Sequence, residues 1–378
     1  MSRTVQGKVT SNSQGMLYVA LELSGKSWKL AMTDGTVKIR MATVPTGAIA
    51  GVLFAAKKAK EKLGLEQAAR IVSCYEAGRD GFWIHRALVA AGFENVVVDP
   101  SSIEVDRRQR RAKTDRLDAQ KLVAQLVRHV ERGDRFHVVR VPSVRDEDDR
   151  RLERELLRLK KERQAHVVRM LSLMALHGVC SKVTAHFGLL VGALRQPNGE
   201  PLPPALSAEL KREADRLELV RTQIRALEKA RRERIRARST RAAQVAAMLT
   251  TLRGVGENSA SILAHEFFGF RDFDNGRQVG ACAGMVGAPY SSGNVDQEQG
   301  ITKAGNRRVR ATAIELAWAW LWYQPESALA QWYTRRFADQ GGRMKRVGIV
   351  ALARKLLVAL WRYSKDGIIP DGAQLKAA

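Results

Sequence analysis

Four acidic residues stand where a carboxylate could bind a metal ion. Glu22 lies in the apolar run Leu17–Leu23, and Glu76 follows a second apolar run at the carboxyl end of an expected strand. A carboxylate among apolar strand residues is costly to bury unless it is paired or bound to a cation. Asp115 and Asp118 are three residues apart at an expected helix start, so they share one face. This set of oxygen ligands suits Mg²⁺ or Mn²⁺, which could hold the attacking and leaving oxygens of a phosphodiester.

Each carboxylate also has a purely structural interpretation. Asp115 could stabilise the start of its helix through the helix dipole. Asp118 could pair with Lys113 or Arg116, and Glu22 could be a half-exposed strand residue. The metal interpretation is favoured only when all four are considered together, in the order of elements given below.

A serine lies in a long glycine-bounded segment, residues 284–305. Ser292 is followed by Gly293, so we expect its hydroxyl on a mobile loop. A serine hydroxyl is a poor nucleophile until a base or metal removes its proton and cations stabilise the charge on the attacked phosphate. Polar and cationic residues follow in sequence: Lys303, Asn306, Arg307, Arg308 and Arg310. A plain Ser-Ser-Gly turn is the structural alternative.

Two further features favour nucleic-acid binding. A dense basic loop before the acidic pair would attract phosphates. Its cations are Arg107, Arg108, Arg110, Arg111 and Lys113. Residues 252–256 resemble a helix-hairpin-helix turn, in which Gly254 and Gly256 would let backbone N–H groups contact a phosphate. The structural alternatives are a solvated charged surface and a plain turn between helices.

The composition indicates a polyanionic partner. The 378 residues include 64 lysines and arginines against 39 aspartates and glutamates, a net charge of +25. Such an excess favours DNA or RNA, because each neutralised phosphate releases counterions. A hydrophobic content of 45% excludes a wholly disordered basic tail.

The cysteines and the apolar segments indicate a cellular compartment. Cys74, Cys180 and Cys282 are far apart and form no CxxC pair, which argues against a disulfide scaffold and a zinc finger. We find neither a signal-peptide core nor an apolar stretch of about 18 residues. We therefore expect a cytoplasmic protein without a membrane partner.

The elements that must position the acidic residues form an alternating pattern. Strand patterns occur at 17–23, 27–32, 37–41, 69–75 and 95–98, and helical patterns at 47–63, at 83–91 and from about 114. Asp34-Gly35 between two strand patterns predicts a hairpin. Three hairpin-linked strands followed by β–α alternation predict an α/β domain with a mixed sheet, an order that matches the RNase H-like fold.

The middle of the chain has a different pattern. Leucines and other apolar residues repeat at heptad spacing in 143–176 and 205–249, and the seam is broken by Arg163, His166 and Glu213. This pattern predicts an antiparallel helical hairpin or a dimerising coiled coil, with 196–204 as its tip loop or a linker. The rest of the chain is expected to be helical, with a glycine-rich break at 280–300. We thus predict an α/β domain at 1–135, a helical arm at 136–245 and an all-α domain at 246–378.

Taken in order, the motifs resemble one family. The runs around Glu22, Glu76 and Asp115–Asp118 are followed by Gly-Val-Gly, Pro-Tyr-Ser-Ser-Gly and Lys-Ala-Gly-Asn-Arg-Arg-Val-Arg. The chain is similar over nearly its whole length to the DEDD/serine insertion-sequence transposases, the "one-ten" family of bridge-RNA-guided recombinases.

The resemblance implies a function and assigns roles. Its acidic tetrad on a RuvC-like domain matches Glu22, Glu76, Asp115 and Asp118, and its nucleophilic serine matches Ser292. It further implies a structured bridge RNA, target and donor DNA, a dimer to tetramer, a covalent phosphoserine and a nucleoid-associated place in a bacterium. The first tetrad residue is usually Asp, and here it is Glu22, whose longer side chain can still bind a metal. The neighbouring Ser291 leaves a shift of the nucleophile by one residue open.

Two other functions remain as alternatives. A metal-dependent nuclease that resolves DNA junctions would use water as the nucleophile and form no covalent adduct. A non-catalytic DNA- or RNA-binding architectural protein would use only the basic surfaces.

Overall fold

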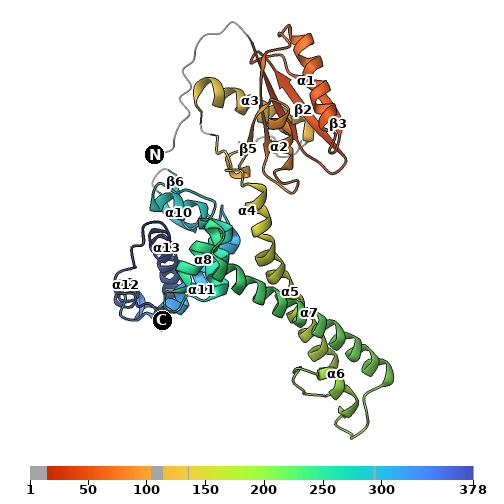
Figure 1. Cartoon of the computed structure of the whole chain (residues 1–378), viewed down its shortest axis with the longest axis vertical. Helices are drawn as coiled ribbons and strands as arrows, with labels where there is room; N and C mark the ends of the chain where they lie inside the picture. The colour runs from red at the N-terminus through yellow and green to blue at the C-terminus, as the bar shows by residue number, and fades with distance from the viewer. Residues whose placement is uncertain (1–14, 104–113, 135, 293–294, 378) are drawn as a thin grey trace. The chain divides into compact units, whose positions relative to one another are not determined.

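The computed structural model describes residues 15–103, 114–134, 136–292 and 295–377 (Figure 1). The chain separates into two compact units, Met1–Pro142 and Ser143–Ala378. No helix of the described residues is long and apolar enough to cross a membrane. The division of the second unit into an arm and a C-terminal domain stays a prediction.

The first unit is built on a mixed five-stranded sheet. Its strands are β1 (Met16–Glu22), β2 (Ser27–Thr33), β3 (Arg40–Pro45), β4 (Arg70–Glu76) and β5 (Glu94–Val98), in the spatial order β3-β2-β1-β4-β5. The first three strands pair antiparallel, whereas β1, β4 and β5 are parallel. The sheet with its helices is compatible with the expected RNase H-like fold.

The third strand begins later than predicted, at Arg40 rather than Val37. The carboxylate of Asp34 accepts hydrogen bonds from the backbone N–H (3.0 Å) and the hydroxyl (2.6 Å) of Thr36. Gly35 adopts a φ of 95°, which glycine tolerates best. These bonds hold the chain in a turn after Asp34, so the strand starts only beyond it.

Helices cover both faces of the sheet because strand side chains alternate between the two faces. One face packs Leu17, Val19 and Leu21 against α1 (Ile49–Leu63) and α2 (Trp83–Ala90). On the other face, Tyr18 and Ala20 pack with the apolar side of α3 (Asp115–Arg132). The predicted helices of this domain are therefore confirmed.

The second unit begins with an antiparallel hairpin of long helices. The two long helices are α5 (Arg151–Ala175) and α7 (Pro204–Ala237). The short helix α4 (Val144–Asp149) precedes α5, and the short helix α6 (Phe187–Leu190) lies in the connection between α5 and α7. Ion pairs Lys160–Glu228 (3.0 Å) and Arg169–Glu209 (2.5 Å) show that α5 and α7 run antiparallel. Of the two alternatives for the heptad seam, the structure has the hairpin within one chain.

Two of the polar breaks in the heptad seam lie opposite each other. The imidazole of His166 in α5 contacts the carboxylate of Glu213 in α7 at 2.6 Å, and Arg216 binds the same carboxylate at 2.6 Å. Glu213 is buried. The breaks therefore form one polar layer, because a buried carboxylate requires such partners.

The remaining elements share one large core. They are α8 (Arg241–Thr250), α9 (Glu257–Leu263), a π-helix (Ala264–Phe268), α10 (Gly276–Cys282), β6 (Gly287–Ser292), β7 (Val295–Ile301), α11 (Arg307–Tyr323), α12 (Ala328–Phe337) and α13 (Gly342–Asp366). The core includes Leu352 and Leu356 of α13. Of the tryptophans in α11, Trp320 is buried, whereas Trp318 and Trp322 are 51% and 80% exposed. In the sequence, the cluster of Trp318, Trp320 and Trp322 favours burial in a helix, with base stacking as the alternative, and burial is confirmed for Trp320 alone.

Candidate functional site

Glu22 and Glu76 end two neighbouring parallel strands. In the β1–β4 register, Leu21 lies opposite Tyr75, and each glutamate is the next residue of its strand. Both side chains are half-buried. Tyr18 and Ala20 face α3, and by strand alternation Glu22 lies on that same face. The same alternation places Glu76 there too, because Val72 and Cys74 pack with α3.

The direction of α3 brings the two aspartates to the same end of the sheet. Near the end of α3, Glu131 accepts a hydrogen bond from the hydroxyl of Tyr18 (3.3 Å), close to the start of β1. The first turn of α3, with Asp115 and Asp118, therefore lies toward the ends of β1 and β4. Thr114 caps the helix, since its hydroxyl accepts the Leu117 N–H (3.4 Å).

The four carboxylates share this end of the sheet without forming a closed cluster. In the part of the chain that the structure describes, no three His, Cys, Asp or Glu side chains are grouped closely enough to bind one metal ion. The donor set fits Mg²⁺ or Mn²⁺, which prefer carboxylate oxygens. Acidic residues in a first helical turn also stabilise the helix, so the metal role of Asp115 and Asp118 stays a prediction.

The basic loop before α3 lies outside the described residues. Its members are Arg107, Arg108, Arg110, Arg111 and Lys113. Their contact with phosphate stays a prediction.

Ser292 is the last residue of β6 rather than part of a mobile loop. The backbone of β6 pairs antiparallel with β7, with Ser292 opposite Val295 and Ser291 opposite Asp296. The Gly-Asn pair between Ser292 and Val295 is a turn signal in the sequence, although the polar residues of β7 lack the alternation that marks a strand. The glycine-rich break expected at 280–300 thus contains a β-hairpin, and Ser292 lies at the end of β6 that is nearest the turn.

The residues after the hairpin make several structural bonds. The Asn306 side chain caps α11 by accepting the N–H of Arg308 (3.0 Å) and of Val309 (3.3 Å). The guanidinium of Arg310 donates to the carbonyls of Ala283 (3.0 Å) and Lys303 (3.2 Å). The bonds of Arg310 attach the start of α11 to the residues on either side of the hairpin. Among the other cations here, the Lys303 and Arg307 side chains are exposed.

The predicted hairpin turn connects α8 and α9. Gly254 has a φ of 86°, and a Cβ there would lie 2.9 Å from the Cβ of Tyr323. Gly256 precedes the first residue of α9. Gly254 therefore has a structural reason to be glycine, whereas a Cβ at Gly256 would meet nothing within 4 Å. Phosphate binding by this turn stays a prediction.

Glu266 is a polar centre that the sequence reading overlooked. Its side chain is 2% exposed within the π-helix, and Arg154 of α5 binds both carboxylate oxygens at 2.8 and 3.1 Å. Arg308 at the start of α11 contacts it at 3.4 Å. Burial opposes ionisation, yet the hydrogen bonds and charge of Arg154, with the charges of Arg308 and Arg150, hold the pKa of Glu266 below its usual value. The sequence signal for this buried ion pair is a single carboxylate in the mainly apolar stretch 260–270.

The chain is similar in sequence to known transposases. Residues 246–332, which include the serine hairpin, match the transposase family described as IS116/IS110/IS902. A putative transposase, y4rJ, of Sinorhizobium fredii (strain NBRC 101917 / NGR234) is 41% identical over 377 residues, covering 96% of this chain and 95% of that protein. A second putative transposase of that strain, y4qE, is 27% identical over 316 residues, covering 78% and 75%.

A more distant relative shares a shorter region. The transposase for insertion sequence element IS1328 of Yersinia enterocolitica is 29% identical over 129 residues, 33% of this chain and 37% of that protein. Together with the match of nearly full length, these similarities show that the chain belongs to the IS116/IS110/IS902 family of transposases, which are phosphoryl-transfer enzymes.

Proposed function

We propose that this transposase is an RNA-guided DNA recombinase that exchanges strands through a covalent bond between DNA and Ser292. The observation that carries the proposal is the shared end of the sheet: β1 and β4 finish there with Glu22 and Glu76, and α3 begins there with Asp115 and Asp118. Four acids from separate elements at one end suit phosphodiester chemistry better than any single structural role.

The proposed step conserves the energy of the phosphodiester. The Ser292 oxygen forms a bond to phosphorus, the bond from phosphorus to the 3′ oxygen breaks, and the proton of the serine passes to that leaving oxygen. The DNA is then held as a 5′-phosphoserine ester. A 3′ hydroxyl of another strand can reverse the step, so strands are rejoined without an external energy source.

The chain's own residues have separate roles in this scheme. Glu22, Glu76, Asp115 and Asp118 would hold Mg²⁺ or Mn²⁺, which supplies Lewis-acid polarisation of the phosphate when bound. Lys303 and Arg307 are exposed beyond the hairpin, where their charge favours the approach of phosphate. Asn306, Arg308 and Arg310 hold the start of α11 and thereby orient those cations.

The proposed partners are a structured bridge RNA, target DNA and donor DNA. A net charge of +25 supports binding to more than one nucleic-acid strand. A homo-oligomer, from dimer to tetramer, would bring two cleaved duplexes together. Sequencing the RNA that co-purifies with the protein would identify the guide, and finding no structured RNA would contradict this part.

A denaturing gel with labelled DNA tests the covalent step. Wild-type protein with its co-purified RNA and DNA sites should give a protein–DNA adduct that survives denaturation. Ser292→Ala should give none, while RNA and DNA binding stay at the wild-type level, because one hydroxyl contributes little to a nucleic-acid interface. Ser291→Ala is the matched control and should retain the adduct.

Other outcomes of the same gel refute parts of the proposal. An adduct that persists in Ser292→Ala and disappears in Ser291→Ala would move the nucleophile by one residue. Metal-dependent cleavage without any adduct would replace the covalent step with attack by water.

A further inference from the structure

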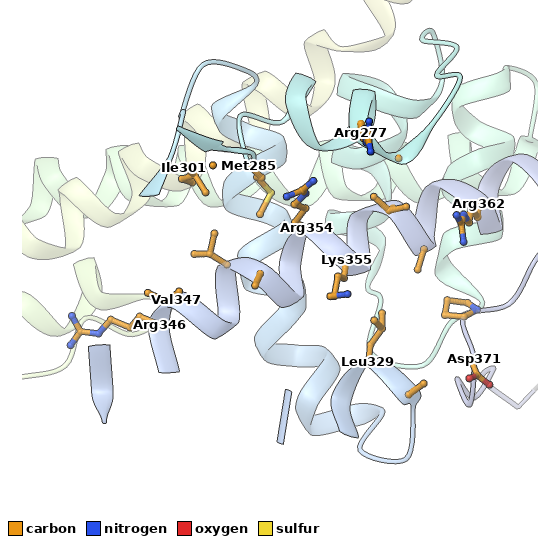
Figure 2. A pocket seen from close by; sticks show the side chains of 18 of the residues that line it. Arg277, Met285, Ile301, Leu329, Arg346, Val347, Arg354, Lys355, Arg362 and Asp371 are labelled. Atoms are coloured by element: carbon orange, nitrogen blue, oxygen red, sulfur yellow. The ribbon is translucent and has the colours of Figure 1, made fainter. Parts of the chain in front are cut away.

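A long groove runs along one side of α13 in the second unit (Figure 2). Its volume is about 1610 Å³. One wall comes from the start of α10 and the base of the serine hairpin, with Met285 and Ile301. The other wall comes from the start of α12, with Leu329, and from the C-terminal segment 368–371. The groove therefore adjoins the hairpin that carries Ser292.

The lining of the groove is strongly cationic. Arg343, Arg346, Arg354 and Arg362 recur along α13 at helical spacing, so they lie along one side of that helix. From Arg343 to Arg362 the row extends about 28 Å at 1.5 Å per residue. Arg277 and Lys355 add two more cations, and among the described residues of this lining only Asp371 is acidic. Within the described ranges, no carboxylate pairs with any of these arginines, so their charge is available to a ligand.

The surface between the cations is apolar. Val347, Ile368 and Ile369 line the groove and are 51%, 58% and 44% exposed. The backbone of a DNA duplex is charged and hydrated, and its bases are stacked inside, so a duplex would gain little from such a surface. An unpaired strand offers both chemistries: phosphates for the arginines and base faces for the apolar residues.

We propose that the α13 groove binds an unpaired DNA strand. The choice of DNA rests on the proposed function, because strand exchange by Ser292 leaves unpaired nucleotides beside the cleaved phosphate. The hairpin from Gly287 to Ser292 is about 17 Å long at 3.3 Å per residue. The groove at the hairpin base would therefore hold nucleotides a short distance along the strand from the cleaved phosphate.

Fluorescence anisotropy with the full-length protein tests this site. The probe is a labelled single-stranded DNA of about 12 nucleotides. The test variant combines Arg346→Gln, Arg354→Gln and Arg362→Gln. If each arginine neutralises one phosphate, the slope of log K against log salt falls by about 2, at 0.7 per contact. At about 0.1 M salt this corresponds to a loss of about 100-fold in affinity.

Two further variants separate the groove from general charge. Arg158→Gln, Lys161→Gln and Arg163→Gln remove the same charge from the exposed side of α5 and should leave the salt slope unchanged. Val347→Glu places an anion on the apolar floor and should weaken binding without lowering the melting temperature, since the side chain is half exposed.

Each other result overturns the proposal in a recognisable way. An equal loss in the α5 control would mean that only overall charge matters. If a duplex of the same sequence binds as tightly and loses as much affinity in the arginine variant, the occupant of the groove is a duplex. If the matching RNA strand binds more tightly than the DNA strand, the occupant is RNA. The assay needs no cleavage, so an absent Ser292 adduct would refute the proposed function and leave this result standing.

Discussion

The buried contact between Glu266 and Arg154 predicts that its two partners differ in importance. Replacing Arg154 with Met leaves a carboxylate that is 2% exposed, with Arg308 at 3.4 Å as its closest remaining cation. Removing one partner of a buried ion pair destabilises a protein by about 3 to 5 kcal/mol. Because Arg308 remains near the carboxylate, we expect a cost at the lower end of this range, about 3 kcal/mol. Replacing Glu266 with Gln leaves two arginine side chains that are each 45% exposed and can reach water. We expect a cost of about 1 to 2 kcal/mol for that change.

The two single variants and the double variant can be compared by thermal unfolding of the full chain. A loss of about 3 kcal/mol in a unit of this size lowers the melting temperature by about 6 to 12 °C. The double variant Arg154→Met, Glu266→Gln should be more stable than the sum of its parts predicts, by about 1 to 3 kcal/mol. An Arg154→Met protein as stable as Glu266→Gln, or fully additive effects, would refute the argument.

The same contact has a pH dependence whose sign follows from the pKa of Glu266. Because the pKa in the folded protein is lowered, the stabilisation is present above the pKa of the unfolded chain, about 4.3, and is lost as the pH falls through the folded value. In Arg154→Met, burial dominates and the pKa rises. The variant's deficit in stability should therefore be smaller at about pH 5 than at pH 7. A deficit that grows toward low pH would contradict this order of pKa values.

Three other predictions concern separate parts of the chain. Asp118→Asn should abolish DNA cleavage and leave DNA binding near the wild-type level, since it removes one metal ligand but few phosphate contacts; cleavage and gel-shift assays on one preparation test this, and wild-type cleavage would exclude the metal role. Replacing the four arginines between 107 and 111 by Gln should lower the salt slope of duplex binding by up to about 0.9 per lost contact. Anisotropy titrations measure that slope, and an unchanged value would mean that these arginines are only solvated. Gly254→Ala should destabilise the second unit by about 1 to 2 kcal/mol, because its φ is positive and Tyr323 occupies the space of a Cβ; an unchanged melting temperature would contradict that reason, and Gly256→Ala is the control, as a Cβ there meets nothing within 4 Å.

Most of the first unit could be predicted because its elements depend on local patterns. Alternating and helical periods indicated β1, β2, β4, β5 and all three of the longer helices. The shift of β3 depends on hydrogen bonds of Asp34, which a hydrophobic pattern does not reveal. The sequence indicated Glu76 at the carboxyl end of its strand, whereas Glu22 was expected within a strand and in fact ends β1. The distance between the two carboxylates depends on side-chain packing.

The second unit was less predictable where contacts are distant in sequence or where strands are polar. β7 carries Asp296, Gln297, Glu298 and Gln299, so it has none of the hydrophobic alternation that marks a strand. Glu266 gains its partners from Arg154 and Arg308, which lie 112 and 42 residues away. No local pattern indicates such partners. Among the tryptophans of α11, burial is confirmed only for Trp320, because the side chains of Trp318 and Trp322 are exposed.

The polar layer of the helical hairpin has a mechanical consequence. Sliding α5 along α7 would separate His166 from the buried carboxylate of Glu213, which would keep Arg216 of its own helix but lose this partner on α5. The cost of that loss favours movement of the two helices together as one rod. α7 alone is about 51 Å long at 1.5 Å per residue. It ends at Ala237, and the φ of 49° at the next residue, Arg238, separates it from α8. A rotation of about 10° at that break would displace the far end by about 9 Å, so the hairpin acts as a lever that amplifies small changes at its base.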